Sequence, residues 1–293
     1  IRFEARDAFG NRDFDFSGQA TLSNAKLVNS PVSANAANGI VDFTALTFND
    51  KGANESVFAS SGTLASATAT NIIITGNRLS DIIETPGFVY SSNIRYDLPE
   101  NQLNDITQNS VAVFGITIRD GGVNGDADTY PTVLTQLQVQ ITSGNATHIK
   151  RLALYDGTTE IAEVAAGVSA NQTVTFSGFS YTIPDNSTRQ LTLRASFRAP
   201  IDDNAQLTYR ITGALADINV GGSTFSNHPS LTLANQPISN TTGDINRLEA
   251  IGDRLFFTQQ PASHLLGNPI TVSLRVQDAL GTTERDFISI PVS

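Results

Sequence analysis

The stretch IRFEARDAFG, residues 1–10, recurs 271 positions later as VSLRVQDALG, residues 272–281. Three of its residues are identical in both places, and four more are exchanged for another apolar residue. The identical pairs are Asp7 and Asp278, Ala8 and Ala279, and Gly10 and Gly281. Further on, Arg12-Asp13-Phe14 recurs as Arg285-Asp286-Phe287, two residues out of register, which predicts a small insertion. An internal repeat decides architecture before any local pattern does, and we interpret this one as a tandem repeat with a period near 271.

Both copies of the stretch lie among short predicted strands. Residues 1–76 alternate apolar and polar side chains between turns rich in Gly, Asn and Asp, and Ile1, Phe3 and Ala5 share one face. Such spacing is typical of a β-sandwich. We predict an immunoglobulin-like sandwich over residues 1–76 that lacks its N-terminal strand. That kind of strand precedes the second copy at residues 254–261, so residues 244–293 are predicted to hold the first strands of the next immunoglobulin-like repeat.

The central residues 77–243 have a different pattern of predicted strands, which indicates a larger β-sandwich. Leu137, Val139 and Ile141 alternate with glutamines, and Asp156-Gly157 is a strong hairpin signal. About eight such strands suit a jelly roll. The predicted fold class is therefore all-β, with tandem β-sandwiches in which partial immunoglobulin-like domains flank a larger jelly-roll-like sandwich.

The composition excludes several classes of function. Cysteine is absent, so the chain has neither disulfides nor thiolate metal sites. A net charge of -10 disfavours binding to nucleic acid. No apolar run approaches the roughly 18–20 residues that span a bilayer, so we expect no membrane insertion. The chain opens on Ile1 without a visible signal peptide, and we expect both ends to continue into a longer protein.

Residues 1–76 and 248–293 carry a set of shared motifs. These are Gln260-Pro261 before a strand, Asp-Ala-x-Gly at Asp7 and Asp278, and Asn-Gly-x-x-x-Phe from Asn38 to Phe43. In these motifs the chain resembles the immunoglobulin-like repeats of very large bacterial (Bacteroidota-type) secreted surface adhesins. The resemblance implies a non-catalytic repeat on the cell surface. It identifies no ligand and implies no catalytic residues.

One loop has the composition of a cation site. In the stretch DGGVNGDAD, four side chains bear oxygen: Asp120, Asn124, Asp126 and Asp128. Three glycines let the backbone fold tightly, and calcium takes six to eight such oxygens. Three carboxylates placed this closely would repel one another without a cation. We predict a calcium site here, with an ordinary solvated loop as the alternative; the spacing differs from that of an EF-hand.

Three weaker acidic groups have plainer interpretations. Asp13 and Asp15 share a strand face and are expected to form salt bridges, and Asp202-Asp203-Asn204 is expected to form a turn. The third group is Asp97 and Glu100, which flank Pro99 in a loop.

No catalytic constellation is visible in the sequence. His148, His228 and His264 each lie alone in a polar stretch, where we expect solvated surface side chains. Neither a HExxH nor a Gly-x-Ser-x-Gly motif occurs. Carboxylates paired from distant segments stay open as an alternative. The aromatic cluster Phe88, Tyr90 and Tyr96 is expected to be the buried face of a strand rather than a sugar site. We predict that the chain is not an enzyme.

Three functional hypotheses follow. The first is a structural segment of a giant repetitive surface protein, an adhesin stalk or extracellular fibre, whose partners are neighbouring repeats or identical chains. The second is a glycan- or protein-binding module within such a protein. The third is a fibre subunit that polymerises by strand complementation. All three place the protein outside the cell, secreted or on its surface.

Overall fold

The computed structural model describes residues 1–74, 80–143, 145–165, 172–225, 245–263 and 265–287. Over these residues the chain is almost entirely strand, and the only helices are the short 3-10 turns η1 (Pro99–Asn101) and η2 (Ala146–His148). The prediction of an all-β sandwich protein is confirmed. Among the described residues, no helix has the length and apolar character needed to cross a membrane.

The N-terminal unit is a small sandwich of two antiparallel sheets. Its strands are β1 (Arg2–Glu4), β2 (Gln19–Ser23), β3 (Val32–Asn35), β4 (Ile40–Asp42), β5 (Gly52–Ser60) and β6 (Ala67–Ile74). One sheet has the order β3-β2-β5-β6 and the other pairs β1 with β4. Alternate residues of the strands face inward, and Leu22, Val41, Phe43 and Val57 form the buried core between the sheets.

The central unit is a larger sandwich of eight strands. They are β7 (Asp81–Glu84), β9 (Val111–Arg119), β10 (Thr132–Ser143), β11 (Ile149–Asp156), β12 (Thr159–Val164), β13 (Thr173–Ile183), β14 (Thr188–Phe197) and β15 (Thr208–Ala216). The sheets have the orders β12-β11-β14-β9-β7 and β13-β10-β15. Except at the β11–β12 hairpin, each connection from β9 to β15 crosses from one sheet to the other, which is the winding of a jelly roll. The buried rings of Phe114 and Tyr209 stack between the sheets.

The predicted hairpin at Asp156-Gly157 is present. Strands β11 and β12 pair antiparallel across it, and Gly157 has a φ of 57°, which suits a residue without a Cβ atom. Thr159–Val164 is accordingly a strand, as the hairpin signal predicted.

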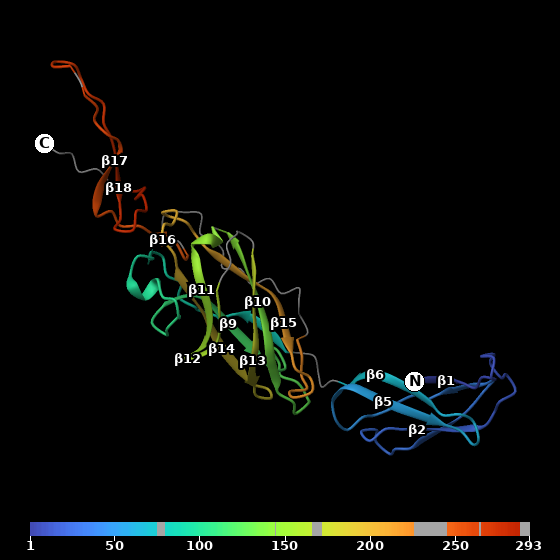
Figure 1. The fold of residues 1–293 in the computed structure, drawn as a ribbon. Helices are drawn as coiled ribbons and strands as arrows, with labels where there is room; N and C mark the ends of the chain where they lie inside the picture. Colours follow the sequence, from blue (N-terminus) through green and yellow to red (C-terminus); the bar gives the residue numbers. More distant parts are fainter. Residues whose placement is uncertain (75–79, 144, 166–171, 226–244, 264, 288–293) are drawn as a thin grey trace.

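The C-terminal segment begins inside the central sandwich and then leaves it. Strand β16 (Leu248–Glu249) pairs in parallel with β8 (Ile94–Arg95), and Leu248 and Ala250 belong to the central core. Strands β17 (Arg254–Gln259) and β18 (Ser273–Gln277) then form a hairpin that projects away from the sandwich (Figure 1). All six residues of β17 are exposed.

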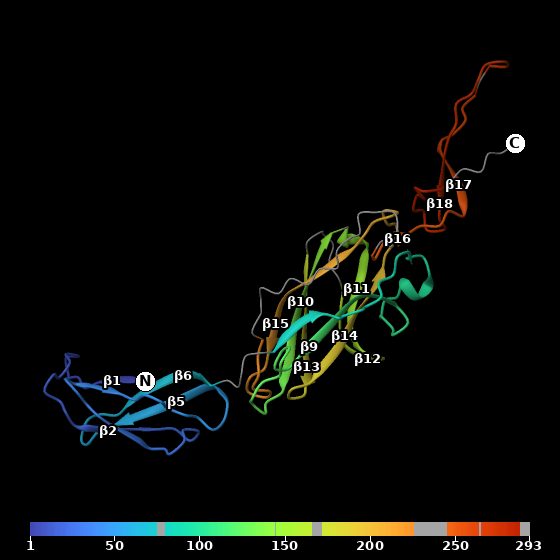
Figure 2. The same ribbon diagram turned by 180° about the vertical axis from the view of Figure 1, so that it is seen from behind.

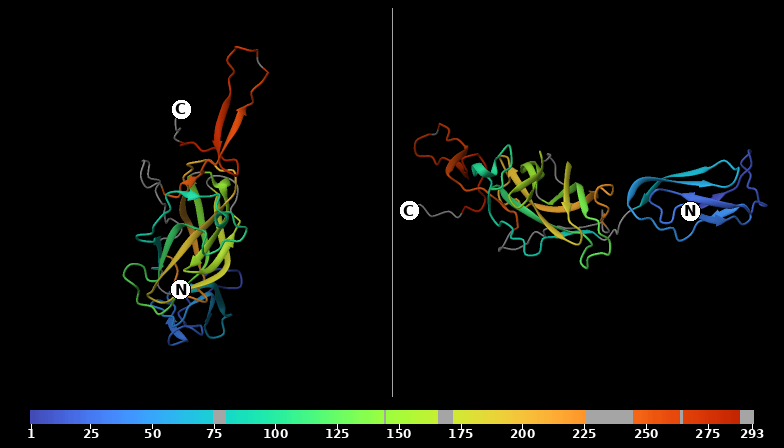
Figure 3. Two further views of the ribbon diagram at one scale, coloured as in Figure 1. Left: turned by 90° about the vertical axis from the view of Figure 1, so that its left-hand side faces the viewer. Right: turned by 90° about the horizontal axis from the view of Figure 1, so that it is seen from below.

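The three parts follow one another along an elongated molecule. The N-terminal unit and the C-terminal hairpin lie at opposite ends of the central sandwich, and the view from behind shows the same succession (Figure 2). Two perpendicular views agree with it (Figure 3). Lys51 connects the first two parts, because its Nζ donates to the carbonyls of Val220, at 2.9 Å, and Gly221, at 2.7 Å.

Candidate functional site

The repeated sequence stretch forms the same turn at both ends of the chain. Asp7 Oδ1 accepts from the amides of Phe9 and Asn11, both at 2.9 Å. Asp278 Oδ1 accepts from the amides of Leu280, at 3.0 Å, and Thr282, at 2.8 Å. The carboxylate therefore holds the turn closed in the same way in both copies.

The backbone of the two turns matches as well. Gly10 and Gly281 have φ angles of 86° and 92°, a conformation that favours glycine. The amide of Asp13 bonds the carbonyl of Ala5 at 2.9 Å, and that of Glu284 bonds Val276 at 3.1 Å. The separation of 271 therefore holds from Ala5 through Asp13. The insertion that the sequence predicts before Arg12 is therefore wrong: Arg12 bridges Arg6 as Thr283 bridges Gln277, so Arg12 and Arg285 are not counterparts.

The two turns differ in what surrounds them. Asp7 is exposed, whereas Asp278 is 1% exposed because its turn lies against the end of the central sandwich. The hydroxyl of the buried Tyr96 donates to Asp278 Oδ2, and Thr282 Oγ1 lies 2.6 Å from the same hydroxyl. The Ile201 amide donates to Thr282 Oγ1 at 3.2 Å. Burial, together with the hydrogen bond to Asp278, raises the pKa of Tyr96.

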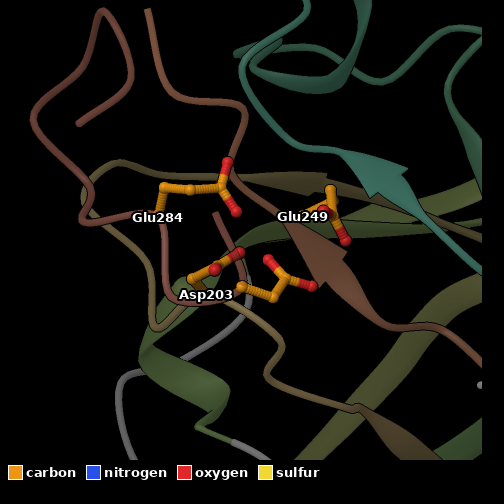
Figure 4. A group of neighbouring side chains, drawn as sticks. Asp203, Glu249 and Glu284 are labelled. Atoms are coloured by element: carbon orange, nitrogen blue, oxygen red, sulfur yellow. The ribbon is translucent and has the colours of Figure 1, made fainter. Parts of the chain in front are cut away.

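Beside this docked turn, four carboxylates gather from three segments of the chain. Asp203, Glu249, Glu284 and Asp286 each have an oxygen within 4.8 Å of the others. Figure 4 shows Asp203, Glu249 and Glu284 pointing toward one another. Asp203 is fixed by the amides of Ala250, at 2.8 Å, and Arg285, at 2.7 Å, so it ties the central sandwich to the C-terminal segment. Such a group could hold either a proton or a cation.

The charge of this cluster is only partly balanced. Burial and a hydrogen bond to Asp286 raise the pKa of Glu284 to about 7, so its carboxyl holds a proton through the acidic range. Burial also raises the pKa of Glu249, although Arg247 lies 3.3 Å from Glu249 Oε2. The Gly252 amide donates to Glu284 Oε2 at 2.9 Å.

The predicted calcium loop lies at the other end of the central sandwich, between β9 and β10. Asp120 is 2% exposed and accepts from Thr132 Oγ1 at 2.5 Å and from the Asn186 amide at 2.9 Å. Asn186 belongs to the β13–β14 turn, and its Oδ1 accepts from the Asp126 amide at 2.6 Å. These bonds close the loop onto the neighbouring turn.

Asp126 is the unusual member of this loop. Both of its carboxylate oxygens are buried, and neither has a hydrogen-bond partner. One of them lies within 4.8 Å of oxygens of Asp120 and Asp185. Burial raises the pKa of Asp126, and the charges of Asp128 and Asp120 raise it further. A buried carboxylate with two unused oxygens can relieve this cost by binding a cation.

The structure divides the four predicted ligands. Asp120 and Asp126 come together, and Asp185, which the sequence indicated only as part of a turn, joins them. Asp128 lies outside this group, and its Oδ1 accepts from the Tyr130 amide at 2.7 Å. Asn124 is exposed.

The weaker acidic groups have mixed outcomes. The Asp202 turn is present, closed by the Ala205 amide on the Asp202 carbonyl at 3.0 Å, but its Asp203 also enters the four-carboxylate cluster. Asp97 forms an ion pair with Arg95 at 2.6 Å. Arg12 lies 4.0 Å from the ring centroid of Phe14, over its face, where a salt bridge was expected. In the turn alignment, Asp13 and Asp15 are the counterparts of Glu284 and Asp286.

The expectation of exposed histidines is wrong for His148. Its side chain is buried, and its Nε2 accepts from the Asp202 amide at 3.0 Å. His228 and His264 lie outside the described residues. Of the aromatic cluster, Tyr96 is buried, but none of the three residues lies in a strand, so the strand prediction is wrong. Phe88 and Tyr90 are half-buried and meet edge to face with ring centroids 4.9 Å apart.

A third acidic group, Asp105, Glu160 and Glu163, lies on the flank of the central sandwich. Two of its members are engaged with their surroundings: Glu163 pairs with Arg151, and Glu160 accepts from the Tyr155 hydroxyl at 3.0 Å.

Comparison of the chain with protein families, curated proteins and solved structures finds no match.

Proposed function

We propose that this chain is a non-catalytic structural segment of a giant repetitive cell-surface protein, an adhesin stalk or extracellular fibre made of β-sandwiches joined end to end. One observation carries the proposal. The turn at Asp7 is exposed, and its counterpart 271 residues later, at Asp278, is docked onto the end of the preceding sandwich through Tyr96. A chain of repeating units needs such a turn at each junction. Its partners are then neighbouring repeats of the same chain or identical chains.

The contacts between units support a stalk. At the first junction, Lys51 donates to two carbonyls of the central sandwich and lies 4.7 Å from the ring centroid of Tyr130. At the second, the buried side chains of Tyr96, Asp278 and Thr282 are bonded to one another. The buried polar contacts of the second junction hold the turn in a fixed orientation, because an opened junction would leave those groups unpaired.

Calcium is the cofactor that this proposal includes. The ion would bind at Asp120 and Asp126 with Asp185, and the two unpartnered, buried oxygens of Asp126 support it. The Ser80 hydroxyl, just after the segment that leaves the N-terminal unit, lies 3.3 Å from Asp120 Oδ1. A cation there would stiffen the loop beside the first junction, because it would link the β9–β10 loop to Asp185 of the β13–β14 turn.

The mass of the native polypeptide tests the proposal. We expect a denaturing gel to give a band of far more than 31.2 kDa, with sequenced peptides that continue from residue 293 into further repeats. A band near 31.2 kDa would contradict it. The second candidate, a subunit that polymerises by strand complementation, would then be favoured by the exposed apolar residues Leu255 and Phe257 of β17.

A further inference from the structure

The outer edge of β1 is open among the described residues. β1 pairs with β4 alone, and the main-chain bonds of Ile1 and Ala5 point toward that side. The main-chain groups of Arg2 and Glu4 therefore point to the opposite edge, since antiparallel strands alternate the direction of their hydrogen bonds. A cavity of about 60 Å³ lies beside this edge. Its apolar lining includes Phe3, Ala5, Phe16, Ala20, Val41 and Leu64.

The C-terminal hairpin supplies a template for this edge. β18 is the counterpart of β1, and its matching edge is paired with β17. The Val276 carbonyl accepts from the Glu284 amide on the edge of β18 that faces away from β17. The Ala5 carbonyl of β1 accepts the equivalent bond, from the Asp13 amide. On the β17 side, the Asp253 amide donates to the Gln277 carbonyl at 2.8 Å. The edge that β17 occupies on β18 is thus the edge that is open on β1.

The register of the hairpin fixes which side chains would meet. In the C-terminal hairpin, Leu255 pairs with Val276 and Phe257 pairs with Leu274. A shift of 271 residues turns these partners into Ala5 and Phe3, both of which line the cavity.

Strand β17 carries exposed apolar side chains on both faces, and the register of the hairpin decides which face meets β1. Leu255 and Phe257 share one face because side chains alternate along a strand, and they are 67% and 41% exposed in the hairpin. Phe256 points to the other face, with Arg275 4.9 Å from its ring centroid. Leu255 and Phe257 thus present an exposed apolar face, and the cavity beside β1 presents an apolar lining.

We propose that the open edge of β1 accepts a strand with the sequence of β17 from another copy of the repeat. The leucine and the second phenylalanine of that strand cover the cavity beside Ala5 and Phe3. This inference rests on the proposed repetition of the chain. The acceptor pairs through the main chain of Arg2 and Glu4, and the cavity selects the side chains, as in other cases of strand addition.

A tandem protein tests the proposal: residues 1–271 followed directly by residues 1–293. It contains one β1 with an open edge and one that follows a β17 strand. We expect the amides of Arg2 and Glu4 in the second copy to exchange with deuterium about 100-fold more slowly than in the first. Mass spectrometry separates the copies, because only the second yields a peptide in which Thr271 precedes Ile1. Protection of β9 in both copies checks that the protein is folded.

Two neighbouring phenylalanines provide matched variants. We expect Phe257→Ser in the first copy to raise the exchange rate of the Arg2 and Glu4 amides of the second copy to the rate seen in the first copy. We expect Phe256→Ser in the first copy to leave those second-copy amides slow. Equal exchange in the two copies, or equal effects of the two variants, would overturn the strand addition. The native mass does not enter this measurement. If the native polypeptide has the mass of one period while the second copy of the tandem protein is protected, the proposed function alone is overturned. If the native protein is repetitive while both copies exchange equally, the strand addition alone is overturned.

Discussion

The Tyr96 hydroxyl donates a hydrogen bond to Asp278 Oδ2 across 182 residues of sequence. Both side chains are buried at the junction between the central sandwich and the C-terminal turn. We expect Tyr96→Phe to destabilise the docked turn by about 1–3 kcal/mol, because it leaves a buried carboxylate oxygen without its donor. Hydrogen exchange of residues 276–284 measures this opening, and we expect it to accelerate about tenfold or more.

Tyr90→Phe is the matched control for this prediction. The Tyr90 hydroxyl also bonds a carboxylate, that of Glu84, but the contact lies within the central sandwich. We expect exchange at residues 276–284 to stay unchanged in this variant. Equal acceleration in both variants would mean that the junction does not depend on the Tyr96 bond.

The calcium proposal predicts opposite effects of one substitution with and without the ion. In chelator, Asp126→Asn should raise the unfolding temperature, because it removes a buried charge that lies among other carboxylates. With calcium at about 100 times its Kd, the native chain should gain about 2.7 kcal/mol and the variant nothing. Calorimetry in the two buffers measures both effects.

The choice of ligands gives this experiment its control. Asp185→Asn should abolish the calcium response as Asp126→Asn does, because Asp185 belongs to the cluster. Asp128→Asn should retain most of it. If Asp128→Asn abolished the response and Asp185→Asn retained it, the ligand set predicted from the sequence would be supported. The set of Asp120, Asp126 and Asp185 would then be contradicted.

The fold could be predicted from the sequence because its signals are local. Alternation such as that of Leu137, Val139 and Ile141 shows directly which side of a strand is buried, and all three are in the core. Asp156-Gly157 likewise specifies its turn from two residues. Alternation does not specify which strands pair, so the sequence did not give the order β12-β11-β14-β9-β7.

The same limit explains what was missed at the sites. Asp120 and Asp126 are neighbours in one loop and could be grouped from the sequence. Asp185 reaches them because β9 pairs with β14 while β10 pairs with β13, which brings the two connecting loops to the same end of the sandwich. Glu249 and Asp203 likewise meet through the packing of distant segments. The buried His148 likewise has its hydrogen-bond donor, the Asp202 amide, 54 residues away in sequence.

A substitution at the first junction is expected to change the orientation of the N-terminal unit relative to the central sandwich without unfolding either unit. Lys51→Met keeps the apolar stem but removes both bonds to the central sandwich. The chain has no cysteine, so Thr63→Cys and Thr158→Cys place one spin label on each unit. We expect the distance distribution between the labels to broaden in Lys51→Met. Lys150→Met is the control, since its bond to the Gln102 carbonyl lies within the central sandwich, and a distribution that broadens equally there would contradict the prediction.

The carboxylate cluster predicts a pH dependence of stability at the second junction. The pKa of Glu284 is raised from 4.5 to about 7, so between these values the folded chain holds a proton that the unfolded chain has released. The stability from this group is fully present below about pH 4.5 and is lost as the pH rises through about 7. Urea unfolding at pH 5 and pH 8 should show the junction weaker at pH 8, and Glu284→Gln should reduce the difference.

The titration itself can be observed directly. The chain has only eight glutamates, so selective ¹³C labelling of their carboxyls gives few signals, and Glu284→Gln identifies the one that belongs to Glu284. We expect that signal to titrate well above the usual range of a glutamate, because burial disfavours its charge and Asp286 shares a hydrogen bond with it. A midpoint near the ordinary value of 4.5 would mean that the cluster is open to water, and the docked turn would then carry no pH-dependent part of the stability.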